Sequence, residues 1–139
     1  MTILYYREAR LPANHTVRLE DDFKPIAINT YNETIRNHST YGLFKSKINL
    51  IYLGVDDGLY YAKIQIKVGH NIFKNNENEF TCFHKEDLYS HIKSYIDSSV
   101  PKNSILLFIT DNGKEEEFDY LIRSLKQELN LKRKAEILL

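Results

Sequence analysis

The chain has one cysteine and no net charge, and both deficits bear on the class of protein. Cys82 cannot form an intrachain disulfide and has no second cysteine for a zinc-binding set. We expect it to be a small buried hydrophobic residue on a strand. Lysine plus arginine and aspartate plus glutamate number 19 each, a balance that argues against an extended electrostatic footprint on nucleic acid.

Long apolar segments are also missing. No run approaches the roughly 18 apolar residues that span a bilayer. The first residues lack the basic region and apolar stretch that mark a signal peptide. We therefore expect a cytoplasmic protein in a reducing environment, with no membrane partner.

The chain does contain enough apolar material for one core. Its 139 residues fit a single domain, and 42% of them are hydrophobic. Ten tyrosines and seven phenylalanines give an unusual aromatic content. Because tyrosine combines a rigid apolar ring with one polar tip, it is frequent at surfaces where proteins contact one another.

The last third of the sequence predicts a strand, a turn, a helix and a strand. Residues 105–109 form an unbroken apolar run, which is typical of a central strand covered on both faces. After a turn at 110–113, a helix is predicted over 114–130, and residues 135–139 give a last short strand. Strand, helix and strand in that order form a right-handed parallel crossover. The apolar stripe of the helix consists of Phe118, Leu121, Ile122, Leu125 and Leu129.

The middle of the chain predicts three strands and a helix. Residues 48–55 are nearly all apolar and predict a second central strand, adjacent and parallel to 105–109. An Asp-Gly turn leads into residues 60–68, where apolar and polar residues alternate as in a half-exposed strand. A third strand is predicted over 79–83 and a helix over 85–98.

The N-terminal part predicts a hairpin and a helix. Residues 3–6 and 16–19 read as paired strands, and Pro25 suits an early helical position. Residues 1–42 then form a possible N-terminal extension packed on the sheet, and residues 43–139 form the mixed α/β core of the same domain. The helix face expected to be apolar consists of Phe23, Ile26, Ala27, Tyr31 and Ile35.

The fold class that follows is α/β (α+β) with a single mixed sheet. Three antiparallel strands are followed by helix, strand, helix and strand. From residue 48 onward this order resembles the ribonuclease H-like fold, and the resemblance covers residues 47–139. The run 104–113, with the helix after it, is similar to the corresponding segment of Piwi and integrase-type members.

The resemblance implies a metal site. Members of this superfamily hold two Mg²⁺ or Mn²⁺ ions between carboxylates, which clamp the attacking and leaving oxygens of a phosphodiester. The catalytic candidates in this chain are Asp57, Glu86 and Asp111, and Asp56 joins them as a candidate metal ligand. In such a sheet the C-terminal ends of the two central strands are neighbours, and the helix carrying Glu86 begins at the same end.

Each of these carboxylates also has an ordinary structural interpretation. Asp-Gly at 57–58 is common hairpin chemistry, since aspartate and glycine tolerate positive φ. Glu86 suits the N-terminus of a helix through the macrodipole. Asp111 opens an Asp-Asn-Gly turn sequence.

Composition favours a binding protein. A small, neutral, tyrosine-rich chain without a complete catalytic set predicts a cytoplasmic inhibitory protein that covers a protein partner's surface, without catalysis or cofactor. Immunity proteins and phage-encoded inhibitors of host defence act in this way. The alternative is a ribonuclease H-like two-metal nuclease using Mg²⁺ or Mn²⁺, or a catalytically degenerate relative that binds nucleic acid. The sequence does not indicate an oligomeric state.

Overall fold

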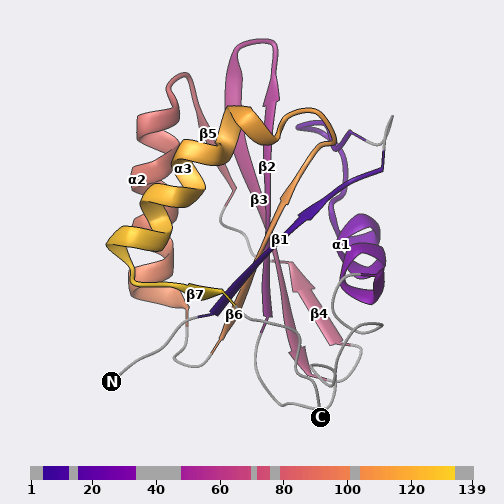
Figure 1. Ribbon diagram of the computed structural model, residues 1–139. Helices are drawn as coiled ribbons and strands as arrows, with labels where there is room; N and C mark the ends of the chain where they lie inside the picture. The colour runs from indigo at the N-terminus through magenta and orange to yellow at the C-terminus, as the bar shows by residue number, and fades with distance from the viewer. Residues whose placement is uncertain are drawn as a thin grey trace.

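A computed structural model shows the arrangement of the chain and describes residues 5–12, 16–33, 48–69, 72–75, 79–100 and 104–133 (Figure 1). The elements follow one another in an α+β order. They are β1 (Tyr5–Arg10), α1 (Lys24–Tyr31), β2 (Ile48–Asp56), β3 (Leu59–Gly69), β4 (Ile72–Asn75), β5 (Phe80–Cys82), α2 (Lys85–Ser99), β6 (Ile105–Thr110), α3 (Glu115–Glu128) and β7 (Lys132–Arg133).

The strands form one mixed sheet between two helical layers. The order across the sheet is β4-β3-β2-β6-β1-β7, and β5 also pairs with β3. Helices α2 and α3 cover one face of the sheet, and α1 lies on the other (Figure 1). The three helices lie within a few residues of the predicted positions, although residue 35 of the first lies outside the described residues.

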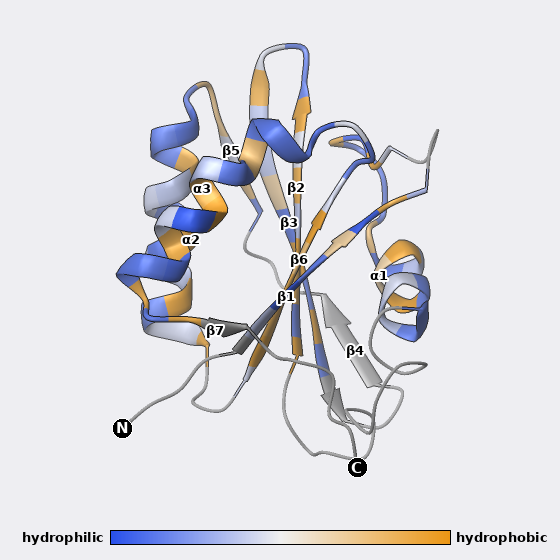
Figure 2. Cartoon of the chain, in the orientation of Figure 1, coloured by the Kyte–Doolittle hydropathy of each residue, from blue (hydrophilic) through white to orange (hydrophobic). Residues whose placement is uncertain are grey.

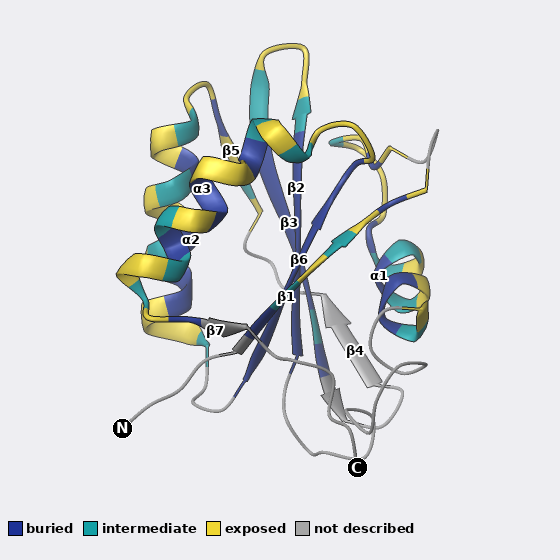
Figure 3. Ribbon diagram, in the orientation of Figure 1, coloured by how far each residue is buried: buried dark blue, intermediate teal, exposed yellow. Residues whose placement is uncertain are grey.

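The two central strands are confirmed. β2 and β6 run parallel as neighbours, with Ile48 opposite Ile105 and Leu53 opposite Thr110. Every residue of β6 is buried, as are the first seven of β2. Both strands lie at the centre of the molecule, where Figure 2 shows hydrophobic residues along them and Figure 3 colours them mostly as buried. Their apolar runs reflect helical cover on both faces.

The predicted N-terminal hairpin is wrong. β1 pairs in parallel with β6 on one side and β7 on the other, so it lies inside the sheet. Residues 16–18 are not in a strand. β1 pairs in parallel with the side of β6 that β2 does not occupy. Two parallel strands need not be neighbours in the sequence. The predicted last strand at 135–139 lies outside the described residues.

The prediction that β3 is half-exposed is also wrong. Its alternate polar residues Lys63, Gln65 and Lys67 are buried, with 3%, 1% and 5% of their surface exposed. The segment before α1 covers this face and supplies polar partners. The ammonium of Lys63 donates hydrogen bonds of 2.6 Å to the backbone oxygens of Leu19 and Asp21. A buried charge is tolerated here because its donors are satisfied.

Two hydrophobic cores flank the sheet. On the side of α2 and α3, the predicted stripe of α3 is confirmed, since Phe118, Leu121, Ile122 and Leu125 are buried and Leu129 packs against them. Cys82 belongs to this core as expected, and burial raises the pKa of its thiol. The core on the α1 side includes Val17, Phe23, Ala27, Tyr31, Tyr52 and Tyr61. Within the described residues, no helix has the length and apolar character needed to cross a bilayer.

Candidate functional site

Three of the four candidate carboxylates lie exposed at the ends of elements. Asp56 is the last residue of β2, and Asp57 stands in the following turn with φ of +51°. Glu86 lies in the first turn of α2, where it faces the positive end of the helix dipole. All three therefore occupy the ordinary structural positions that their sequence contexts favour.

Asp111 differs from these because it is buried, with 8% of its surface exposed. The hydroxyl of Tyr52 lies 2.9 Å from each of its carboxylate oxygens and donates to them. Burial raises the pKa of the Asp111 carboxyl, and the hydrogen bond from Tyr52 opposes that rise. Tyr52 belongs to the core beneath α1, so the Asp111 carboxylate lies on the α1 side of the sheet.

The structure does not bring the four candidates together. Glu86 is carried by α2, which packs on the opposite face from the one that Asp111 faces. Successive side chains along an extended chain alternate between faces, and Asp111 follows Ile109 on the α1 side. Within the described residues, which include all four, no group of three or more His, Cys, Asp or Glu is placed to hold a metal ion.

The surroundings of Asp111 indicate a structural role. The hydroxyl of Tyr61 donates to the backbone oxygen of Val17, and the ring centroids of Phe23 and Tyr52 are 5.8 Å apart. Gly54 makes room for the two tyrosines, since a Cβ there would lie 2.6 Å from Cζ of Tyr61. The contacts of Tyr61 with Val17 and of Tyr52 with Phe23 hold the segment before α1 against the sheet.

A more open feature lies on the other side of the molecule. Between α2 and α3 there is a hollow of about 500 Å³, called here the α2–α3 groove. It exists because the apolar stripes of both helices face the sheet, which turns their polar residues and off-stripe tyrosines outward. Its lining includes four glutamates and two tyrosines, namely Glu86, Glu116, Glu117, Glu128, Tyr89 and Tyr120.

One of the four glutamates is already engaged. The ammonium of Lys85 lies 3.0 Å from Glu117, and the hydroxyl of Tyr60 donates to the same carboxylate at 3.1 Å. These two contacts lower the pKa of Glu117. Lys85 also lies over the ring of Tyr60, 5.6 Å from its centroid. Lys85, the one lysine among the described residues that line the groove, therefore already contacts the carboxylate of Glu117 and the ring of Tyr60.

Tyr120 is a strongly exposed aromatic residue of this surface. With 77% of its surface exposed, it is one of two large hydrophobic residues that stand out from the described part of the chain; Phe83 at 75% is the other. Tyr89 is partly buried beside it, and burial is the main cause that raises the pKa of Tyr89, followed by the charge of Glu128. The two rings give the groove an aromatic wall.

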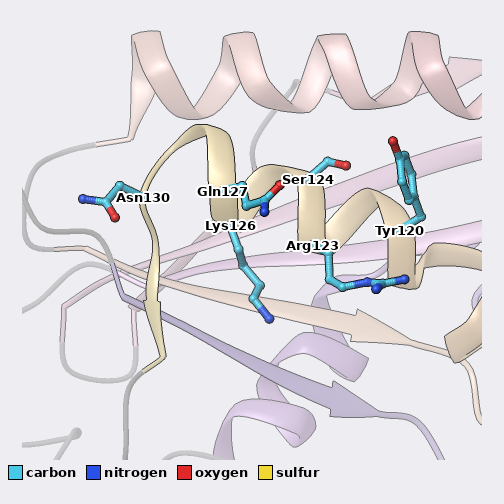
Figure 4. A pocket seen from close by; sticks show the side chains of 6 residues that line it. All are labelled: Tyr120, Arg123, Ser124, Lys126, Gln127 and Asn130. Atoms are coloured by element: carbon cyan, nitrogen blue, oxygen red, sulfur yellow. The ribbon is translucent and has the colours of Figure 1, made fainter.

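A second hollow of about 600 Å³ follows the other flank of α3, and Tyr120 and Ser124 line both hollows. Figure 4 shows Tyr120 pointing toward α2, whereas Lys126 points away from α2 toward the strands. Lys126 lies over the ring of Tyr6, 4.9 Å from its centroid, and Arg123 pairs with Asp119 at 3.3 Å. Tyr120 therefore stands on a ridge between two hollows.

Sequence reasoning singled out the carboxylates near strand ends and did not identify this surface. The available signal was Tyr120 itself, an aromatic residue that lies off the apolar stripe of α3 among charged neighbours. The groove also depends on how far apart α2 and α3 lie, which local sequence does not specify. No protein-family model matches the chain, and comparison with curated proteins and with solved structures finds no match.

Proposed function

We propose that this chain is a small inhibitory or immunity-type binding protein that contacts a protein partner through the surface around Tyr120. The observation that carries the proposal is an exposed tyrosine on a ridge between two hollows. Tyrosine is over-represented among the residues that dominate binding energy, because it buries a large rigid surface at low entropic cost. Binding of this kind requires no catalytic set.

The shape of the surface supports the same proposal. Two packed helices give a rigid frame, since the stripes of α2 and α3 are buried in one core. A rigid frame lowers the cost of ordering on association. The groove combines the rings of Tyr89 and Tyr120 and the side chain of Leu121 with four glutamates, and protein interfaces likewise combine apolar anchors with charged groups.

The test is capture of the partner from native cytosol with the tagged full chain as bait. We expect one protein at a stoichiometric level, and we expect Tyr120→Ala to weaken its binding by about tenfold or more. Phe83→Ala is the matched control, because Phe83 is equally exposed at the end of β5. Retention of the partner by Tyr120→Ala, together with its loss in Phe83→Ala, would place the binding surface elsewhere.

A ribonuclease H-like nuclease, or a degenerate relative that binds nucleic acid, is the second candidate. It is favoured by the element order β2, β3, β4, β5, α2, β6, α3 and β7, in which β4 and β5 both pair with β3. Two features depart from it: β1 separates β6 from β7, and Glu86 is carried by α2, on the sheet face opposite to Asp111. Cleavage of a labelled oligonucleotide with Mg²⁺ or Mn²⁺ tests this alternative directly.

A further inference from the structure

We infer that the partner segment which enters the α2–α3 groove is cationic and places an arginine or lysine side chain against the rings of Tyr89 and Tyr120. The inference rests on the proposed function and adds the chemistry of the occupant. It is carried by the combination of a groove, two aromatic rings and an uncompensated charge in one place.

The groove is negatively charged although the chain as a whole is neutral. The chain as a whole is neutral, with 19 basic and 19 acidic residues, yet the groove is lined by four glutamates and one lysine. That lysine is held by Glu117. Within the described part of the chain, no ion pair engages the carboxylates of Glu86, Glu116 or Glu128. These three therefore set a negative potential at the mouth of the groove.

The tyrosines suit a cation as well. The face of a tyrosine ring attracts a guanidinium or ammonium group through its quadrupole. The chain uses this contact in its own folding, since Lys85 lies over Tyr60 and Lys126 lies over Tyr6. Leu121 adds an apolar contact for the methylene stem of a long basic side chain.

Other occupants fit less well. An acidic segment, or an apolar one without hydrogen-bond donors, would strip water from Glu86 and Glu128 and return no compensating contact. The phosphates of a nucleic acid would be repelled by the same carboxylates. A second copy of the chain would have to supply Arg123 or Lys126 from the other flank of α3, and these two side chains already contact Asp119 and Tyr6.

The experiment compares two synthetic helical peptides of equal length by chemical-shift mapping on the isotope-labelled full chain. One peptide carries two arginines four residues apart, and the other carries glutamines in their place. We expect shifts confined to the groove with the arginine peptide, weakened by added salt, and no shifts with the glutamine peptide. Absence of shifts up to about millimolar peptide, the range of weak single contacts, would overturn the inference, as would shifts outside the groove.

Two matched double variants test whether the arginine peptide depends on the negative charge of the groove. Glu86→Gln with Glu128→Gln should weaken the arginine peptide by about tenfold, since two of the carboxylates that face it are lost. Glu20→Gln with Glu33→Gln removes the same charge from exposed positions outside the groove and should change nothing. Equal effects of the two double variants would overturn the inference.

Two outcomes distinguish this inference from the proposed function. In the first outcome, Tyr120→Ala loses the natural partner, but wild type and the Glu86→Gln, Glu128→Gln double variant bind it equally at all salt concentrations. This result would overturn the inference of a cationic occupant and leave the proposed function standing. Concentration-dependent self-association that Arg123→Gln abolishes would show that the occupant is a second copy, and would overturn the inference of a foreign segment.

Discussion

The hydroxyl of Tyr52 lies 2.9 Å from both carboxylate oxygens of Asp111, and this contact turns the acid toward the α1 side of the sheet. A residue that sequence pattern associated with metal binding is thereby part of the internal packing. The carboxyl pays a desolvation cost there, which raises its pKa.

The raised pKa of Asp111 predicts a pH dependence of stability. An unfolded aspartate titrates near 3.9, so in the window above that value the folded state binds more protons than the unfolded state. The contribution of this group to the free energy of unfolding therefore falls as pH rises through the window and is most favourable below it. Asp111→Asn should remove this dependence and match or exceed wild-type stability at neutral pH.

Urea denaturation of wild type and Asp111→Asn between about pH 3 and 7 measures the difference, since this range brackets the titration of an ordinary aspartate. Tyr52→Phe is the companion variant, because it removes the donor and leaves the carboxylate buried. We expect it to cost about 1.5–3 kcal/mol, the range for hydrogen bonds to charged groups. A wild-type stability that rises relative to Asp111→Asn with increasing pH would contradict this account.

The packing of α3 predicts a contrast between two neighbouring residues. Leu125 is fully buried, so Leu125→Ala should lower the free energy of unfolding by about 2–5 kcal/mol. The side chain of Arg123 is 64% exposed, and Arg123→Ala should change stability by no more than about 0.5 kcal/mol. Chemical denaturation of both variants checks the prediction, and equal costs would show that the buried face of α3 has been misassigned.

The close packing around Gly54 predicts that a methyl side chain at this position lowers the free energy of unfolding. A Cβ at this position would lie 2.6 Å from Cζ of Tyr61 and 2.7 Å from Cε2 of Tyr52. Both rings are fully buried, so they cannot move aside without disturbing the core. We expect Gly54→Ala to cost about 1–3 kcal/mol. Thermal melting of Gly54→Ala measures this, and Tyr61→Leu in the same background should recover part of the loss.

Divalent metals give a prediction that separates the two candidate functions. A ligand that binds only the folded state at 100 times its dissociation constant stabilises it by about 2.7 kcal/mol. If the chain is a binding protein, Mg²⁺ and Mn²⁺ should leave the melting temperature unchanged. A rise with Mn²⁺ that disappears in Asp111→Asn would instead favour the nuclease and count against the binding function.

The sequence predicted those parts of the fold in which local pattern and burial agree. The runs at 48–55 and 105–109 are apolar on both faces because both faces are covered, and the stripe of α3 faces the sheet because 3.6 residues make a turn. Lys63 shows where this reasoning ends. Its position in an alternating strand predicts exposure, and it is buried because the distant carbonyls of Leu19 and Asp21 and the carboxylate of Glu79 satisfy its ammonium.

The candidate site was harder to predict for the same reason. Carboxylates at strand ends are visible in the sequence, but the face toward which each one turns depends on register and on partners such as Tyr52. β1 was missed as an internal strand because residues 5–10 contain no apolar run. The α2–α3 groove arises from the separation of two helices, a property of tertiary packing that the sequence of either helix alone does not contain.

The internal position of β1 also has a consequence for how the chain is made. Tyr5 lies opposite Ile105, about 100 residues later in the chain, so β1 has no partner strand until the residues of β6 have been synthesised. Pairings between such distant segments slow folding, because the entropy of closing a long loop is lost before the contacts form. Until β6 has been made, β1 remains an unpaired strand, and unpaired strand edges make folding intermediates prone to aggregate.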